Sequence, residues 1–217
     1  MHRPLLKPFI VATAVALTCT VVGAQRSDTE GIKETENFVK AGEKTTRSIL
    51  DAKTEIQNTL TAYNALVTQP SKDMKGDYKK LLKAVKDMNE KFTDGRESVA
   101  NMEKLGGTYF EGRSTAIKNI QDAALRDKAQ KRLDQNQADY VGVLRSFQET
   151  GQSLEPLRKD LADQITFLGS DLTPSATASL KPQAEKLNQR GSEVFAKTDR
   201  AVSTANAYFS SMRPTKS

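Results

Sequence analysis

Apolar residues recur at alternating steps of three and four along four separate stretches of this 217-residue chain. That spacing places them on one side of an α-helix, as in the seams of packed helices. No stretch shows a sustained alternation of apolar and polar residues, which is the period of a β-strand. The pattern therefore predicts an all-α fold with essentially no sheet. The four seams are Ile49, Ala52, Ile56, Tyr63 and Leu66; Tyr78, Leu81, Val85, Met88, Phe92, Val99 and Met102; Leu133, Tyr140, Phe147 and Leu154; and Leu180, Leu187, Val194, Ala201 and Tyr208.

Helix breakers divide the seams into segments of similar length. Pro70 must end the first helix, because proline lacks an amide proton and restricts the residue before it. Thr173-Pro174 is typical of the start of a helix. Between them, two boundaries compete: Gly106-Gly107, and the stretch up to Asp122, with Asp122 as an N-cap. We favour Asp122.

These boundaries predict four helices of about 60 Å each, at 1.5 Å per residue. The predicted helices span residues 28–68, 77–119, 122–170 and 174–210. Near-equal helices joined by short turns pack as an elongated antiparallel four-helix bundle of long, coiled-coil-like helices. Pro156 falls inside the third helix, so we expect a kink there.

The N-terminal segment is typical of a secretory signal peptide. Arg3 and Lys7 form a basic start, residues 9–22 are mostly apolar, and small side chains precede residue 25. We expect cleavage between Ala24 and Gln25, which gives a signal peptide at 1–24 and a single helical domain at 25–217 with a short disordered C-terminal tail. The expected location is periplasmic. Cys19 offers an alternative, lipid anchoring in the envelope, but the β-branched Thr18 before it does not suit a lipidation site.

The processed chain would lack the side chains most used in catalysis. The only histidine is His2 and the only cysteine is Cys19, both within the predicted signal peptide. Their removal excludes Cys or His nucleophiles and bases, histidine metal ligands and disulfides. The acidic residues mostly lie near Lys or Arg at helical spacing, as on a solvated face. We therefore expect no enzyme activity, no cofactor and no metal site.

A lysine-rich stretch is the one surface feature that stands out. Lys79, Lys83 and Lys86 share a helix face, and the processed chain would carry 31 basic against 27 acidic residues, a net charge of +4. Such a face is a candidate for contact with anionic lipid or polymer. It is equally typical of the outer face of a soluble helix, whose lysine stems cover apolar surface. Nucleic-acid binding is not expected, because no aromatic residues accompany the lysines as a stacking platform.

The last third of the chain resembles an uncharacterised bacterial envelope family, domain of unknown function 2959. The similar features are a Tyr before Leu-Arg, a Glu-Pro followed by Leu, an Asp-Gln-Ile ahead of an apolar pair, and a C-terminal helix rich in small residues. They lie in ADYVGVLRSFQ (138–148), LEPLRKDLADQITFL (154–168), Leu172, Ser179-Leu180 and residues 205–209, with a weaker extension upstream through Leu125-Arg126. The resemblance implies an exported, often lipid-anchored protein of long helices, and it carries over no functional residues. Gly169-Ser170-Asp171 departs from the family pattern.

Two functions fit these expectations. The first is a structural or protein-interaction module of the cell envelope, whose partners are other envelope proteins. The alternative is a periplasmic holdase chaperone that shields unfolded clients. A chaperone should expose an apolar concave surface or open helix tips, whereas a closed bundle should hide its seams.

Overall fold

The computed structural model describes residues 22–213, and this part of the chain folds into α-helices with no strand. The predicted all-α fold class is thus confirmed. Cys19, residues 1–21 of the predicted signal peptide and residues 214–217 of the predicted tail lie outside the described residues. The helices are α1 (Val22–Thr68), α2 (Met74–Lys118), α3 (Ala123–Ser170), α4 (Pro174–Ser179) and α5 (Lys181–Ser211).

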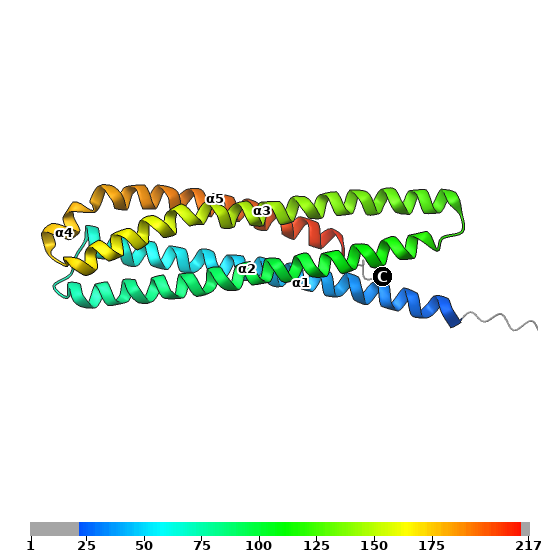
Figure 1. The fold of residues 1–217 in the computed structure, drawn as a ribbon, viewed down its shortest axis with the longest axis horizontal. Coiled ribbons are helices and arrows are strands. Elements are labelled where there is room, and N and C mark those ends of the chain that lie inside the picture. The colour runs from blue at the N-terminus through cyan, green and yellow to red at the C-terminus, as the bar shows by residue number, and fades with distance from the viewer. Residues whose placement is uncertain (1–21, 214–217) are drawn as a thin grey trace, which may run out of the picture.

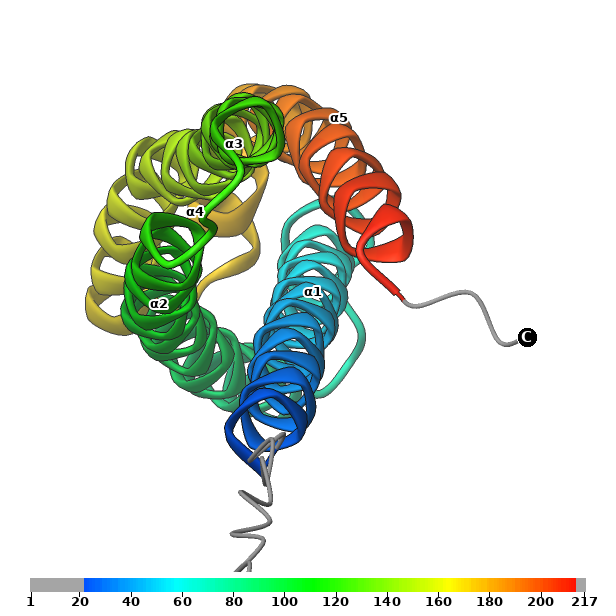
Figure 2. The ribbon, with the colours of Figure 1, turned by 90° about the vertical axis from the view of Figure 1, so that its right-hand side faces the viewer.

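The four long helices lie side by side in an elongated antiparallel bundle (Figure 1). Viewed along the long axis, they form a ring in the order α1, α2, α3, α5 (Figure 2). Each helix packs against its two neighbours in this ring. The short helix α4 lies at one end of the bundle, in the connection between α3 and α5 (Figure 1). This arrangement is the four-helix bundle that the seams predict.

Side-chain caps fix the helix boundaries. The Asp122 carboxylate accepts a hydrogen bond of 2.9 Å from the backbone N–H of Leu125, so Asp122 is the N-cap of α3. The Thr173 hydroxyl oxygen accepts from the N–H of Ala176 in the same way at the start of α4. Helix α2 continues through Gly106-Gly107 and ends at Lys118. Of the two predicted boundaries, Asp122 is therefore the correct one.

Two predicted boundaries differ from the structure. Helix α1 begins at Val22, six residues before the predicted start at residue 28, and so runs through the predicted cleavage site at Ala24 and Gln25. The predicted helix at 174–210 is divided at Leu180 into α4 and α5. Pro182, in the first turn of α5, has no amide proton, so it cannot donate the backbone hydrogen bond that would continue α4. The predicted boundaries did not take this proline into account. Helix α3 passes through Pro156 without ending, and the kink expected there stays a prediction.

Most seam residues are buried, whereas Ile49, Tyr78, Val85 and Val99 are half-buried, and the core divides into two clusters. The cluster near α4, here called the α4-end core, includes Leu66, Leu81, Leu161 and Leu187, each at most 1% exposed. The second cluster, here called the aromatic core, lies toward the other end and is built around aromatic rings from all four long helices. These rings are Phe38, Tyr109, Phe110, Tyr140, Phe147, Tyr208 and Phe209.

Candidate functional site

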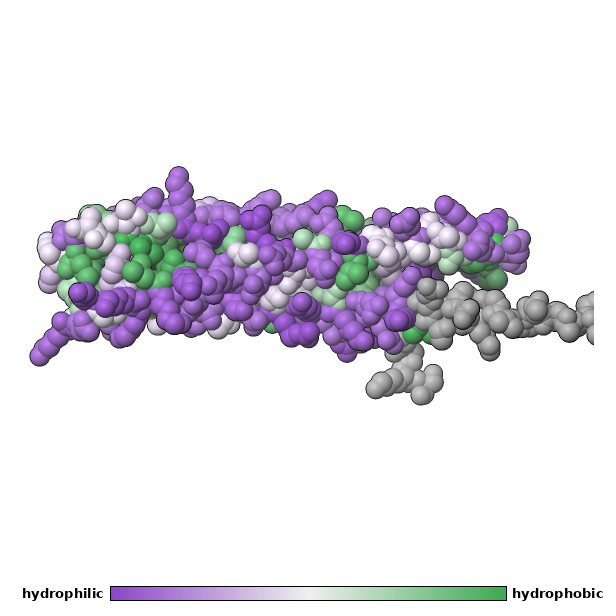
Figure 3. Space-filling view, turned by 60° about the horizontal axis from the view of Figure 1, so that its bottom comes forward, coloured by the Kyte–Doolittle hydropathy of each residue, from purple (hydrophilic) through white to green (hydrophobic). Residues whose placement is uncertain are grey.

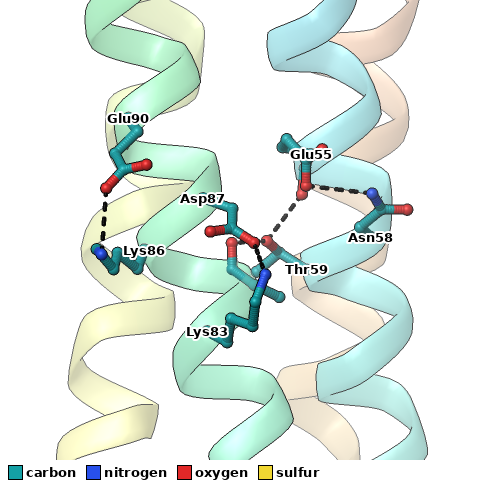
Figure 4. A network of polar contacts seen from close by, with 8 residues as sticks. Glu55, Asn58, Thr59, Lys83, Lys86, Asp87 and Glu90 are labelled. Carbon is teal, nitrogen blue, oxygen red and sulfur yellow. Dashed lines mark hydrogen bonds and ion pairs between the residues drawn. The ribbon is translucent and has the colours of Figure 1, made fainter.

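The three lysines predicted to contact an anionic surface are exposed on α2, but two of them are paired with carboxylates (Figure 4). The Lys83 Nζ lies 2.6 Å from Asp87, and the Lys86 Nζ lies 3.5 Å from Glu90. Each carboxylate stands one helical turn after its lysine. Lys79 forms no ion pair with the side chains that the structure describes, those of residues 31–213.

This pairing limits the positive charge that the lysine face presents. The hydrogen bond and the charge of Asp87 raise the pKa of Lys83, so the lysine keeps its proton and the pair is neutral as a unit. Exposed pairs of this kind contribute little to helix stability, because solvent screens the two charges. The arrangement is that of a solvated helix face. Binding to an anionic surface through Lys79, Lys83 and Lys86 stays a prediction.

The end of the bundle opposite α4 lacks its fourth helix. Helix α5 ends at Ser211, well short of the α2–α3 turn (Figure 1). Because the Phe209 ring packs against Phe38 of α1, residues 22–37 of α1 extend beyond the level of Phe209, over about 24 Å at 1.5 Å per residue. We call this three-helix part the open end.

A groove of about 740 Å³ occupies the open end, where a fourth helix would lie. Its apolar lining includes Ile117 of α2, Ile120 in the α2–α3 turn and Leu133 of α3, next to polar residues of α3 such as Gln135 and Asn136. Tyr208 and Met212 lie at its α5 end. Two exposed apolar side chains stand one turn from groove residues on the same helix faces: Ile32 is 51% exposed and Leu125 is 58% exposed. Figure 3 shows that the middle of the bundle is largely hydrophilic on the face it displays, and that the most extensive hydrophobic area on this face lies at the α4 end.

Two buried polar atoms in the groove wall have no hydrogen-bond partner within the described part of the chain, the Arg113 Nε and the Tyr208 hydroxyl. The Arg113 Nη2 donates to the Thr35 hydroxyl oxygen at 2.7 Å, and its guanidinium lies 5.5 Å from the Tyr109 ring centroid. Burial raises the pKa of Tyr208, with smaller contributions from Tyr109 and other neighbours. Tyr208 thus stays a neutral donor that lacks an acceptor. Tyr208 lies in a predicted seam, but the period of a seam does not reveal that its hydroxyl lacks a partner.

Replacing Tyr208 by Phe should raise the free energy of unfolding by up to about 1 kcal/mol, because it removes a buried hydroxyl without a partner. Tyr140→Phe is the matched control. The Tyr140 hydroxyl donates to the Met102 carbonyl at 2.8 Å, so its loss should cost about 0.5–1.5 kcal/mol. Urea denaturation of both variants measures the difference. Equal losses at the two positions would show that the Tyr208 hydroxyl has a partner after all.

A second hollow, of about 320 Å³, lies halfway along the bundle and is called here the mid-bundle cavity. All four long helices line it, and it separates the α4-end core from the aromatic core. Phe92 and Ile56 belong to the first cluster, whereas Phe147 belongs to the second, and all three face the cavity.

The structure also bears on metal binding and on membrane spanning. Among the described side chains, residues 31–213, no three His, Cys, Asp or Glu gather closely enough to hold a metal ion. In the same range, no helix has a stretch sufficiently long and apolar to span a membrane. The side chains of Ala24 and Gln25 are not described, and the Cys19 site lies outside the described residues.

One comparison with known proteins gave a match. A family model described as a protein of unknown function, DUF2959, matches residues 25–212. The match confirms the resemblance seen in the last third of the chain and extends it over nearly all of the described residues. Neither the curated proteins nor the solved structures gave a match.

Proposed function

The chain belongs to the DUF2959 family of proteins of unknown function, and we propose that it is an exported, non-enzymatic interaction module of the bacterial cell envelope. The observation that carries the proposal is the groove at the open end. Three helices surround it where a fourth is missing, and its lining includes Ile117 of α2 and Leu133 of α3. A helix of a bound partner would occupy the empty position and cover these side chains.

The occupant that this groove fits is an amphipathic helix of another envelope protein. Three antiparallel helices of a four-helix bundle leave a fourth position that is shaped for a helix. Arg113 and Arg132 line the groove against a single carboxylate, Asp139. This excess of positive charge suits a helix that carries Asp or Glu among its apolar residues, because a carboxylate can accept hydrogen bonds from the exposed guanidinium of Arg132.

Two observations support export. Residues 1–24 have the basic, apolar and small-residue regions of a signal peptide in the required order. The family match begins at Gln25, the residue that follows the proposed cleavage site. We propose a periplasmic location, with lipid anchoring through Cys19 as the alternative.

The chemistry of the chain supports binding without catalysis. No histidine or cysteine follows Cys19. Rate enhancement near neutral pH needs a group that exchanges protons there, an activated nucleophile or a metal. Three tyrosines buried in the core are Tyr63, Tyr140 and Tyr208, and burial raises the pKa of each, which keeps their hydroxyls neutral.

Site-specific photo-crosslinking in intact cells, followed by fractionation, tests the proposal. A photoreactive residue replaces Leu125 at the open end or, as the control, Leu50 on the four-helix part, where that leucine is 38% exposed. We expect one or two defined adducts from position 125 in the periplasmic fraction and none from position 50. Arg132→Glu should weaken these adducts, because it reverses the charge of a groove residue.

The exposure of Ile32 and Leu125 also favours a second candidate, the holdase chaperone, because open apolar helix tips suit unfolded clients. The same experiment separates the two functions. Many unrelated adducts from position 125 would indicate a chaperone. Adducts that are identical at both positions, or protein found only in the cytoplasm, would contradict both functions.

A further inference from the structure

The mid-bundle cavity is built where four helices place small residues at the same level. Gly95 of α2 and Gly151 of α3 lie on its walls, together with Ala52 of α1 and Thr198 of α5. A Cβ added at Gly151 would come no closer than 4.0 Å to any neighbour, the Phe92 ring. Gly151 therefore does not serve close helix packing. The space beside it is what interrupts the core.

The cavity wall offers little to water. Thr150 and Thr198 are its buried polar residues, and each hydroxyl already donates to a carbonyl of its own helix at 2.8 Å, that of Ser146 or Val194. None of the unpartnered buried polar atoms found within residues 22–213 lies in this wall. A water molecule needs two to four polar partners to be held in a cavity, whereas apolar cavities stay dry or bind apolar molecules. The wall thus favours an apolar occupant.

The charges at the rim indicate the end group of that occupant. The rim carries Lys53, Arg96 and Glu155. The Lys53 Nζ lies 2.6 Å from Asp199, and Glu155 is 3.0 Å from Arg158, so both charges are compensated. Arg96 forms no ion pair among the described residues. Its guanidinium stands 5.9 Å from the ring centroid of Phe92, which lines the cavity, and is free to receive an anion at the mouth.

We propose that the mid-bundle cavity binds the chain of a single-chain fatty carboxylate, whose carboxylate pairs with Arg96. The volume of about 320 Å³ is at the lower end of ligand pockets, which favours one alkyl chain over a multi-chain lipid. This site is separate from the open end, and the inference does not depend on the proposed function.

Calorimetric titration of the purified protein with dodecanoate, below its critical micelle concentration, tests the inference. We expect saturable binding of one molecule per chain. Gly151→Leu should abolish it, because the new side chain enters the open space beside Phe92. Gly142→Leu is the matched control. Gly142 lies on the same helix, is exposed and has nothing within 4 Å of its added Cβ, so this variant should bind like the original protein.

Two further measurements make the result specific. Both leucine variants gain helix propensity, so their circular dichroism and thermal midpoints should show a fold at least as stable as the original. Arg96→Gln should weaken dodecanoate binding about two- to fivefold but leave the binding of the neutral dodecanol unchanged. The inference is overturned if the original protein binds neither ligand saturably, or if Gly151→Leu binds as tightly as Gly142→Leu. Equal effects of Arg96→Gln on the two ligands would overturn the role of Arg96.

Discussion

Replacing Phe38 by Ala should lower the free energy of unfolding by about 3–5 kcal/mol, the typical cost of deleting a buried phenyl ring. Phe38 is 1% exposed and lies at the centre of the aromatic core. Its ring stacks on Tyr109 at a centroid distance of 4.9 Å and meets Tyr140 edge-on at 5.0 Å. It also contacts the rings of Phe110, Tyr208 and Phe209. Aromatic pairs each contribute about 0.5–1.5 kcal/mol beyond area burial, so the loss should fall in the upper part of the range.

Urea denaturation followed by circular dichroism measures this loss. Phe167→Ala is the matched control, because Phe167 is 41% exposed on α3, and its loss should change stability by only about 0.5 kcal/mol. A similar small effect at both positions would show that the rings of α1, α2, α3 and α5 do not meet around Phe38. A less cooperative unfolding transition in the Phe38 variant, but not in the Phe167 variant, would agree with the position of Phe38 at the centre of the aromatic core.

The seams, the breakers and the caps were readable from the sequence because each is a local property of one helix. A buried helix face must repeat apolar residues at 3.6-residue spacing, whatever its partner. Leu81, Met88, Tyr140 and Leu187 are accordingly buried, as predicted. Asp122 likewise caps the helix that follows it through a bond to an amide three residues on.

Features that depend on the relative axial positions of different helices could not be predicted from the sequence. Phe38 lies outside the predicted seams, and only the packing of four helices brings five other rings around it. The mid-bundle cavity likewise arises because Gly95 and Gly151, distant in sequence, come to the same level in antiparallel helices. The open end exists because α5 stops at Ser211 while α1 and the α2–α3 pair continue. No periodicity within one helix encodes these offsets.

Two helical glycines show how much the packing between helices alters the effect of the same Gly→Ala substitution. Replacing a glycine inside a helix by Ala normally stabilises the helix by up to about 1 kcal/mol. Gly142→Ala should show this gain, since its added Cβ meets nothing within 4 Å. An added Cβ at Gly42 would instead lie 2.2 Å from two ring carbons of Phe209. That ring is 2% exposed and packs against Phe38 and Tyr208, so it has little room to move away.

Gly42→Ala should therefore destabilise the protein by about 1–3 kcal/mol, the usual cost of overpacking a well-filled core, despite its better helix propensity. The two identical substitutions, at Gly42 and Gly142, should thus change the free energy of unfolding in opposite directions. Parallel urea titrations of the two variants measure the sign directly. Adding Phe209→Leu to the Gly42→Ala variant should recover part of the loss, because the smaller side chain leaves space for the new methyl group. A gain in stability at Gly42 would mean that α1 and α5 do not approach each other as closely as the packing of Phe209 on Gly42 requires.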